Sequence, residues 1–341
     1  MSRTDLPGLD LAALRAYLDE HRPGLVTGAL SAEIVPGGRS NLTYRVSDGR
    51  SRWVVRRPPL GHVLPTAHDM AREFRVLSGL RGTAVPVPGT VVLCEDPAVL
   101  GARFYVMEHV EGTPYRTEAE LTALGPDRTR AIADALVDTL VDLHAVEPES
   151  AGLGDFGRPE GFLERQLRRW KKQLDGSRSR DLEGFDLLHD RLAASLPISG
   201  KPSIVHGDYR LDNVLVDDED RVTAVLDWEM STLGDPLTDL ALLVAYAERD
   251  QATARFVSTA SAAPGYPSSD EVVSRYAQRS GRDVSRLGWY VGFAFFKLAV
   301  ILEGIYFRFS QGKTVGAGFE DVSDAVVPLI AHGNQILKEE Q

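Results

Sequence analysis

The pattern of apolar and polar positions changes along the chain and divides it into a strand-rich part and a helical part. Apolar residues from Leu9 to Glu20 recur at helical spacing, so a short leading helix is expected there. From about Leu25 the pattern alternates, and Gly-rich or Asp-Gly turns separate the alternating stretches. It predicts strands at residues 34–35, 42–46, 52–55, 90–94 and 103–110, and a helix at 67–81. A small α+β region is therefore expected.

After Glu111 and Gly112 the pattern becomes that of long amphipathic helices. These helices are expected at residues 128–146, 161–174 and 183–195, and further helices follow a β-hairpin of residues 214–216 and 222–226. The predicted fold is α+β, with a leading helix at 1–24, a strand-rich region at 25–111 and a larger helical region at 112–341.

The longest apolar run extends from Trp289 to Phe309 and is long enough for a membrane helix. Three charged residues, Lys297, Glu303 and Arg308, interrupt it, and such charges are costly in lipid. We therefore interpret the run as a buried helix of a globular region, and no membrane association is expected.

Composition narrows the possible classes of function. The 341 residues include 49 acidic and 38 basic side chains, and the net charge of -11 argues against nonspecific nucleic-acid binding. The single cysteine, Cys94, excludes an intramolecular disulfide and the usual thiolate zinc site, which fits a reducing compartment. Charged residues between Met1 and Arg15 break up the apolar stretch that a secretory signal needs. A cytoplasmic protein is expected.

One motif carries most of the candidate chemistry. His206, Asp208 and Asn213 form H-x-D-x-x-x-x-N between a strand-like segment, Ser203 to Val205, and the predicted hairpin, and Asp227 follows the hairpin. The hairpin folds the chain back, so Asn213 and Asp227 are expected to converge and to offer Mg²⁺ an amide oxygen and a carboxylate. The alternative interpretation is a polar loop whose Asp and Asn cap turns.

This set of residues suits phosphoryl transfer, in which the protein mainly positions groups and neutralises charge. Asp208 can orient a substrate hydroxyl and accept its proton, and nearby Mg²⁺ keeps the carboxylate ionised. Arg210 lies two residues further on, where its cation can reach the transferred phosphate.

The segment from Ile204 to Ala241 resembles the aminoglycoside phosphotransferase family of small-molecule kinases, and the resemblance extends over about residues 28–330. It implies a bilobal protein-kinase-like fold, ATP and Mg²⁺ as cofactors, Asp208 as catalytic base, and Asn213 and Asp227 as metal ligands. It also implies that His206 organises the loop.

The strand-rich region is expected to supply the nucleotide site. The turn at Gly38, Arg39, Ser40 and Asn41 can cover phosphates, since glycine lets the backbone approach closely. The third strand ends in Arg56, where this fold normally presents a lysine, and Glu73 on the next helix is its natural partner. Strand alternation favours Arg56 over the adjacent Arg57 for the phosphate contact. The linker residues Glu108 and Val110 are expected to offer backbone groups to adenine.

The substrate is expected to be a small anionic molecule. Five cations crowd one predicted helix, at Arg165, Arg168, Arg169, Lys171 and Lys172. The motifs look most like those of the kinase-like domain fused to some acyl-CoA dehydrogenases, which implies hydroxyacyl-CoA or hydroxy-acid substrates and a functional link to such a dehydrogenase. The alternatives are an aminoglycoside O-phosphotransferase, a nucleotide-binding pseudokinase without turnover, and a metal-dependent hydrolase that needs no ATP.

Three further polar positions receive structural interpretations. His144 lies on an amphipathic helix and is expected to be a core histidine with its hydrogen bonds satisfied. Asp235 is expected to cap a helix in whose first turn Pro236 lies, and Asp239 adds favourable charge there.

Overall fold

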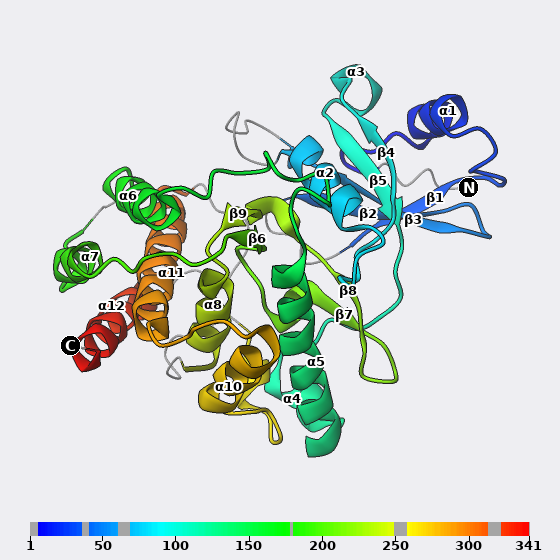
Figure 1. The fold of residues 1–341 in the computed structure, drawn as a ribbon. Helices are drawn as coiled ribbons and strands as arrows, with labels where there is room; N and C mark the ends of the chain where they lie inside the picture. Colours follow the sequence, from blue (N-terminus) through cyan, green and yellow to red (C-terminus); the bar gives the residue numbers. More distant parts are fainter. Residues whose placement is uncertain are drawn as a thin grey trace. The chain divides into compact units, whose positions relative to one another are not determined.

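The computed structural model describes residues 6–35, 41–60, 69–177, 180–248, 258–312 and 322–340. The chain forms two compact units (Figure 1), which are considered separately below. Unit 1 comprises Met1–Gly112 and Thr223–Ser231, and unit 2 comprises Thr113–Val222 and Thr232–Gln341. The short segment that carries Asp227 thus groups with unit 1.

Unit 1 is built on a five-stranded antiparallel sheet in the order β1-β2-β3-β5-β4. Its elements are α1 (Leu11–His21), β1 (Ser31–Ile34), β2 (Leu42–Ser47), β3 (Arg52–Arg57), α2 (Met70–Leu80), β4 (Thr90–Cys94), α3 (Pro97–Leu100) and β5 (Phe104–Glu108), with η2 (Trp228–Met230) from the later segment. The strands predicted from alternation are all present, whereas the pattern did not predict α3.

Alternation gives the sheet of unit 1 two different faces. Trp53 and Val55 of β3 pack into a hydrophobic core that also includes Leu14 of α1 and Phe104 of β5. Helix α2 contacts β4 and β5, and the side chain of Asp69 caps it by accepting a hydrogen bond from the Arg72 amide. The expected start of this helix, at residues 67–68, lies outside the described residues.

Unit 2 is mainly helical. Its elements are α4 (Glu118–Thr122), α5 (Pro126–Ala145), α6 (Phe162–Asp175), α7 (Phe185–Ala194), β6 (Ser203–Val205), η1 (Leu211–Asn213), β7 (Val214–Val216), β9 (Thr232–Gly234), α8 (Leu237–Glu248), η3 (Ala260–Ala262), α10 (Ser269–Ser280), α11 (Leu287–Ser310) and α12 (Val322–Glu339). The strand β8 (Val222–Val225) begins at the boundary of the two units. Strands β6 and β9 pair antiparallel, and the motif from His206 to Asn213 lies between them in the sequence.

Helix α11 is the central helix of unit 2 and packs against α6, α7, α8 and α12 (Figure 1). Among the described residues it is the one helix long and apolar enough to cross a membrane, but 78% of its most apolar window is buried inside the structure. It therefore packs as a core helix, in agreement with the interpretation of the apolar run. Lys297 and Glu303, the charges that interrupt the run, are themselves buried.

Candidate active site

Arg56 is the centre of a polar cluster in unit 1. Its Nε lies 2.9 Å from Oε2 of Glu73 on α2, and its Nη2 pairs with Oδ1 of Asp227. The side chain of Arg56 is 13% exposed and that of Glu73 only 2%, so this is a largely buried ion-pair network. Burial alone would lower the pKa of Arg56, but the Glu73 and Asp227 carboxylates together raise it.

Glu73 receives hydrogen bonds from two further groups. The hydroxyl of Tyr105, which lies opposite Arg56 in the register of β3 and β5, donates to Oε2 at 3.0 Å. Nδ2 of Asn41 donates to Oε1 at 3.3 Å. Burial, reinforced by the charge of Asp227, raises the pKa of Glu73 to about 7, although Arg56 favours the ionised form. Asn41 and Arg56, both expected at the nucleotide site, therefore contact Glu73.

Asp227 has an unusual backbone conformation. Its φ of 65° lies in the left-handed region, which residues other than glycine rarely adopt, although Asp is among those that tolerate it. The indole of Trp228 donates a 2.9 Å hydrogen bond to Val225 O, and Arg72 of α2 donates to Ser231 O at 3.1 Å. These bonds hold the segment on both sides of Asp227. Strained backbone of this kind often marks a functional position.

Arg57 lies on the opposite face of β3 from Arg56. It is buried, and its Nη1 donates to Gly8 O at 2.7 Å and to Leu100 O at 2.8 Å. The structure thus assigns the two arginines different partners: Arg57 binds main-chain carbonyls, and Arg56 binds the carboxylates.

The remaining residues expected to bind nucleotide differ in what the structure reveals. Gly38, Arg39 and Ser40 lie outside the described residues. Glu108 ends β5, and its N–H donates to Gly89 O at 2.8 Å; Val110 follows two residues later. Their assignment to adenine stays a prediction.

In unit 2 the carboxylate of Asp208 is held at both oxygens. The hydroxyl of Tyr246 on α8 donates to Oδ1 at 2.8 Å, and Nδ2 of Asn213 donates to Oδ2 at 3.1 Å. Asn213 also donates to the backbone carbonyl of Asp208 at 2.8 Å. Arg210 lies nearby, with Nε 3.5 Å from Oδ2 of Asp208 and its guanidinium over the Tyr246 ring. The structure thus brings Asp208, Arg210 and Asn213 together.

Buried side chains from two helices hold the backbone of the loop that begins at His206. Asp239 of α8 accepts hydrogen bonds from the amides of His206 at 2.6 Å and Gly207 at 2.8 Å. Lys297 of α11 donates to Gly207 O at 2.6 Å. Gly207 has a φ of 86°, a conformation that favours glycine. His206 accepts a 3.2 Å hydrogen bond at Nδ1 from the Asp208 amide, as its expected role in organising the loop requires.

His144 supports Asp239 from α5. Its Nε2 lies 3.3 Å from Oδ2 of Asp239, and its Nδ1 lies 2.8 Å from the Tyr276 hydroxyl. Because a carboxylate only accepts hydrogen bonds, Nε2 carries the proton and Nδ1 accepts from Tyr276. Burial lowers the pKa of His144, and the residue is a satisfied core histidine, as expected.

Three residues of this site were not found from the sequence pattern. Asp239 was expected only to add charge at a helix start, whereas Tyr246 and Lys297 were not assigned to the site. All three lie on apolar helices far along the chain from Asp208. For Asp239 and Lys297 the sequence did contain one signal, a charged side chain inside an otherwise apolar helix. Such a side chain is rarely buried without a partner.

The residues expected to bind Mg²⁺ carry oxygen donors of the kind that this ion prefers. The side-chain nitrogen of Asn213 donates to Asp208, so the side-chain oxygen of Asn213 remains as an electron-pair donor for a cation. The neighbouring Asp212 has a buried Oδ1 with no hydrogen-bond partner among the described residues, which also suits a cation. Asn213 belongs to unit 2 and Asp227 to unit 1, so their convergence stays a prediction. Across the described ranges, no cluster of three or more His, Cys, Asp or Glu could hold a metal.

The cations of α6 divide into two groups. Arg165, Arg168 and Lys171 contact carbonyls or carboxylates of unit 2. Arg169 and Lys172 are exposed and form no ion pair with any residue in the described ranges, although Arg169 also lies over the Trp170 ring. The free positive charge of this helix is thus smaller than its composition suggests.

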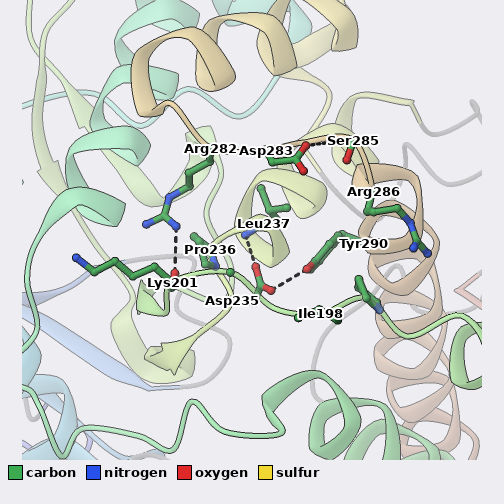
Figure 2. A pocket seen from close by; sticks show the side chains of 12 residues that line it. Ile198, Lys201, Asp235, Pro236, Leu237, Arg282, Asp283, Ser285, Arg286 and Tyr290 are labelled. Atoms are coloured by element: carbon green, nitrogen blue, oxygen red, sulfur yellow. Dashed lines mark hydrogen bonds between the residues drawn. The ribbon is translucent and has the colours of Figure 1, made fainter.

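A pocket of about 440 Å³ opens elsewhere in unit 2 (Figure 2). Asp235 lies in its wall and accepts hydrogen bonds from the Leu237 amide at 3.1 Å and the Tyr290 hydroxyl at 2.7 Å. The first of these bonds agrees with the expected helix cap. Arg282 of the same pocket donates to Lys201 O at 3.0 Å. The lining includes none of the residues expected to bind ATP, metal or the acceptor hydroxyl.

Comparison with known proteins gives consistent matches. The sequence model of the Phosphotransferase enzyme family (APH) matches residues 31–276. Acyl-CoA dehydrogenase family member 11 of Rattus norvegicus is 35% identical over 336 residues, which cover 96% of this chain and 43% of that protein. The chain thus spans less than half the length of this protein and of the Mus musculus relative of the same name.

Solved structures show the same fold. A protein of Ralstonia eutropha JMP134, provisionally described as an aminoglycoside phosphotransferase, is 34% identical with a TM-score of 0.84, covering 97% of this chain and 98% of that one. A thermostable variant of aminoglycoside phosphotransferase APH(4)-Ia, in complex with AMP-PNP and hygromycin B, is 18% identical with a TM-score of 0.59, covering 96% and 98%. The predicted α+β, kinase-like fold class is confirmed.

Proposed function

The chain belongs to the phosphotransferase enzyme family, and we propose that it is a Mg²⁺- and ATP-dependent kinase that phosphorylates a hydroxyl of a small anionic molecule. The observation that carries this proposal is the carboxylate of Asp208, which Tyr246 and Asn213 hold at its two oxygens. A carboxylate fixed in this way is suited to accept a proton from a substrate in a defined direction.

Each residue of the site has a role in this reaction. Asp208 orients the acceptor hydroxyl and takes its proton while the hydroxyl oxygen bonds to the γ-phosphorus and the bond to the ADP oxygen breaks. Arg210 neutralises charge on the transferred group, and Arg56, kept in place by Glu73, binds the phosphates. Asn213 and Asp227 would hold Mg²⁺, which when bound offsets the negative charge of the phosphates.

The acceptor proposed here is a hydroxyacyl-CoA or a free hydroxy acid. Arg169 and Lys172 on α6 are exposed and form no ion pair with any residue in the described ranges. They provide positive charge in unit 2 that suits an anion. The curated relatives are named as acyl-CoA dehydrogenase family members, which supports an acyl-CoA chemistry and a functional link to such an enzyme.

Release of ADP should be measured with a panel of hydroxyacyl-CoAs, hydroxy acids, aminoglycosides, choline and sugars, at fixed Mg²⁺ and ATP. We expect turnover with hydroxyacyl-CoA or hydroxy acids, and activity confined to aminoglycosides would contradict the proposed substrate. Turnover of esters without ATP would favour a hydrolase.

A pair of variants tests the role of Asp208. Asp208→Asn should abolish turnover and retain nucleotide binding, whereas Asp218→Asn in the exposed hairpin turn should behave as the wild type. Nucleotide binding without turnover in the wild type itself would identify a pseudokinase.

A further inference from the structure

Helix α11 carries a single lysine, Lys297, and its ammonium lies directly beside the catalytic loop. The residue is 7% exposed, and its Nζ donates to Gly207 O at 2.6 Å. The same Nζ lies 5.6 Å from the centroid of the Trp170 ring on α6. Burying an ammonium is unfavourable unless it is compensated, so these contacts, together with nearby carboxylates, must keep the charge in place.

The peptide groups next to the catalytic base are held from two sides by opposite charges. Asp239 accepts a hydrogen bond of 2.8 Å from the amide of Gly207, and Lys297 donates to the carbonyl of the same residue. The two charged side chains come from α8 and α11, which pack against each other in unit 2 (Figure 1). Gly207 immediately precedes Asp208 in the chain. The orientation of the Gly207 peptide group therefore sets the position of the Asp208 Cα, from which the carboxylate side chain extends.

The surroundings of Lys297 are charged as well as apolar. The carboxylates of Asp208 and Asp239 attract its ammonium, and the guanidinium of Arg169 repels it. Burial, the largest influence, lowers the pKa of Lys297. An apolar side chain would fill the same space between helices without this penalty, so the charge points to a task beyond packing.

We propose that Lys297 is a positioning residue for phosphoryl transfer, which fixes the Gly207 carbonyl and thereby the direction in which Asp208 meets the acceptor hydroxyl. Tyr246 and Asn213 hold the carboxylate, and Asp239 and Lys297 hold the backbone from which it extends. This inference rests on the proposed function, because it takes Asp208 as the base. A small displacement of a base is enough to slow a reaction strongly.

The test compares Lys297→Met, which keeps an unbranched stem, with Lys297→Arg, which restores a cation, and with Glu303→Gln. Glu303 is a matched control, since it is a buried charge on the same helix that pairs with Arg180 at 2.9 Å. For each variant, kcat and KM are measured per folded protein with the acceptor identified in the ADP-release panel. Hydrogen exchange of the amides of residues 206–208 is followed in parallel.

Lys297→Met should lower kcat about 100-fold and leave KM for ATP within about twofold. Its loop amides should exchange about tenfold faster, since the opening of the loop costs less free energy. Lys297→Arg should recover most of kcat, and Glu303→Gln should change kcat and loop exchange by less than about twofold even if it lowers the melting temperature. A kcat loss shared equally by Lys297→Met and Glu303→Gln would show a purely structural role and overturn the inference.

Failure of the proposed function gives a different result. If the wild type transfers phosphate to no acceptor, the proposed function fails. Hydrogen exchange alone then tests whether Lys297 holds the loop backbone at Gly207. Exchange of the loop amides that is unchanged in Lys297→Met would then overturn the inference as well.

Discussion

The hydroxyl of Tyr246 donates a 2.8 Å hydrogen bond to Oδ1 of Asp208, although the two residues are 38 positions apart in the sequence. Tyr246 therefore donates a hydrogen bond to one carboxylate oxygen of the proposed base, and Asn213 donates to the other. Each carboxylate oxygen can accept a second hydrogen bond, so a substrate hydroxyl can bind without displacing the tyrosine. This arrangement makes Tyr246 a positioning residue of the proposed base.

Replacement of Tyr246 by Phe removes this hydrogen bond and keeps the ring over which Arg210 lies. We expect kcat to fall about tenfold, as for the loss of one hydrogen bond of about 1.5 kcal/mol to a charged group, with KM for ATP unchanged. Steady-state ADP release would measure this. Tyr17→Phe, which removes a hydroxyl that donates to Leu93 O in unit 1, is the control and should leave kcat unchanged. A faster Tyr246→Phe enzyme would mean that the hydroxyl competes with the substrate.

The pairing of Arg56 with Glu73 predicts a strong effect on stability. Arg56→Met leaves the buried Glu73 carboxylate without its cation and should lower the free energy of unfolding by about 3–5 kcal/mol at pH 8. The double variant Arg56→Met/Glu73→Gln should be more stable than Arg56→Met alone, because the buried position 73 then carries no unpaired charge. Urea unfolding of the four proteins in this cycle measures the coupling. Strictly additive losses would contradict a direct interaction between the two side chains.

The parts of the site that depend on local spacing could be predicted from the sequence. The motif from His206 to Asn213 lies in one short loop, and alternation along β3 correctly separates Arg56 from Arg57, since neighbouring residues of a strand face opposite sides. The apolar run of α11 was also correctly interpreted as a buried helix. In each case the pattern that sets the structure lies within one continuous segment of the chain.

The residues that reach the loop from a distance could not be predicted in the same way. Lys297 lies 90 positions from Gly207, and its contact depends on which face of α11 packs against α8 and α6. Helical periodicity identifies an apolar face but does not name its partner. The position of Asp239 at a helix start was enough to explain its charge from the sequence. Its hydrogen bonds to the loop amides of His206 and Gly207 were therefore not predicted.

The raised pKa of Glu73 predicts a dependence of stability on pH. Burial raises this pKa from an ordinary value of 4.5 to about 7, so the folded protein binds the proton more tightly than the unfolded chain does. The free energy of unfolding should therefore fall as the pH rises from about 4.5 to about 7, by an amount on the order of 1–3 kcal/mol, and this contribution should level off above that range.

Urea unfolding of the wild type and of Glu73→Gln at a series of pH values isolates this contribution. The glutamine keeps the shape of the side chain and cannot ionise, so the difference in stability between the two proteins should shift in its favour as the pH rises through this window. Arg56 favours the ionised form of Glu73 and limits the shift. In Arg56→Met the fall in stability should therefore extend to higher pH. A difference between wild type and Glu73→Gln that stays constant from pH 4.5 to pH 8 would mean that Glu73 titrates equally in both states.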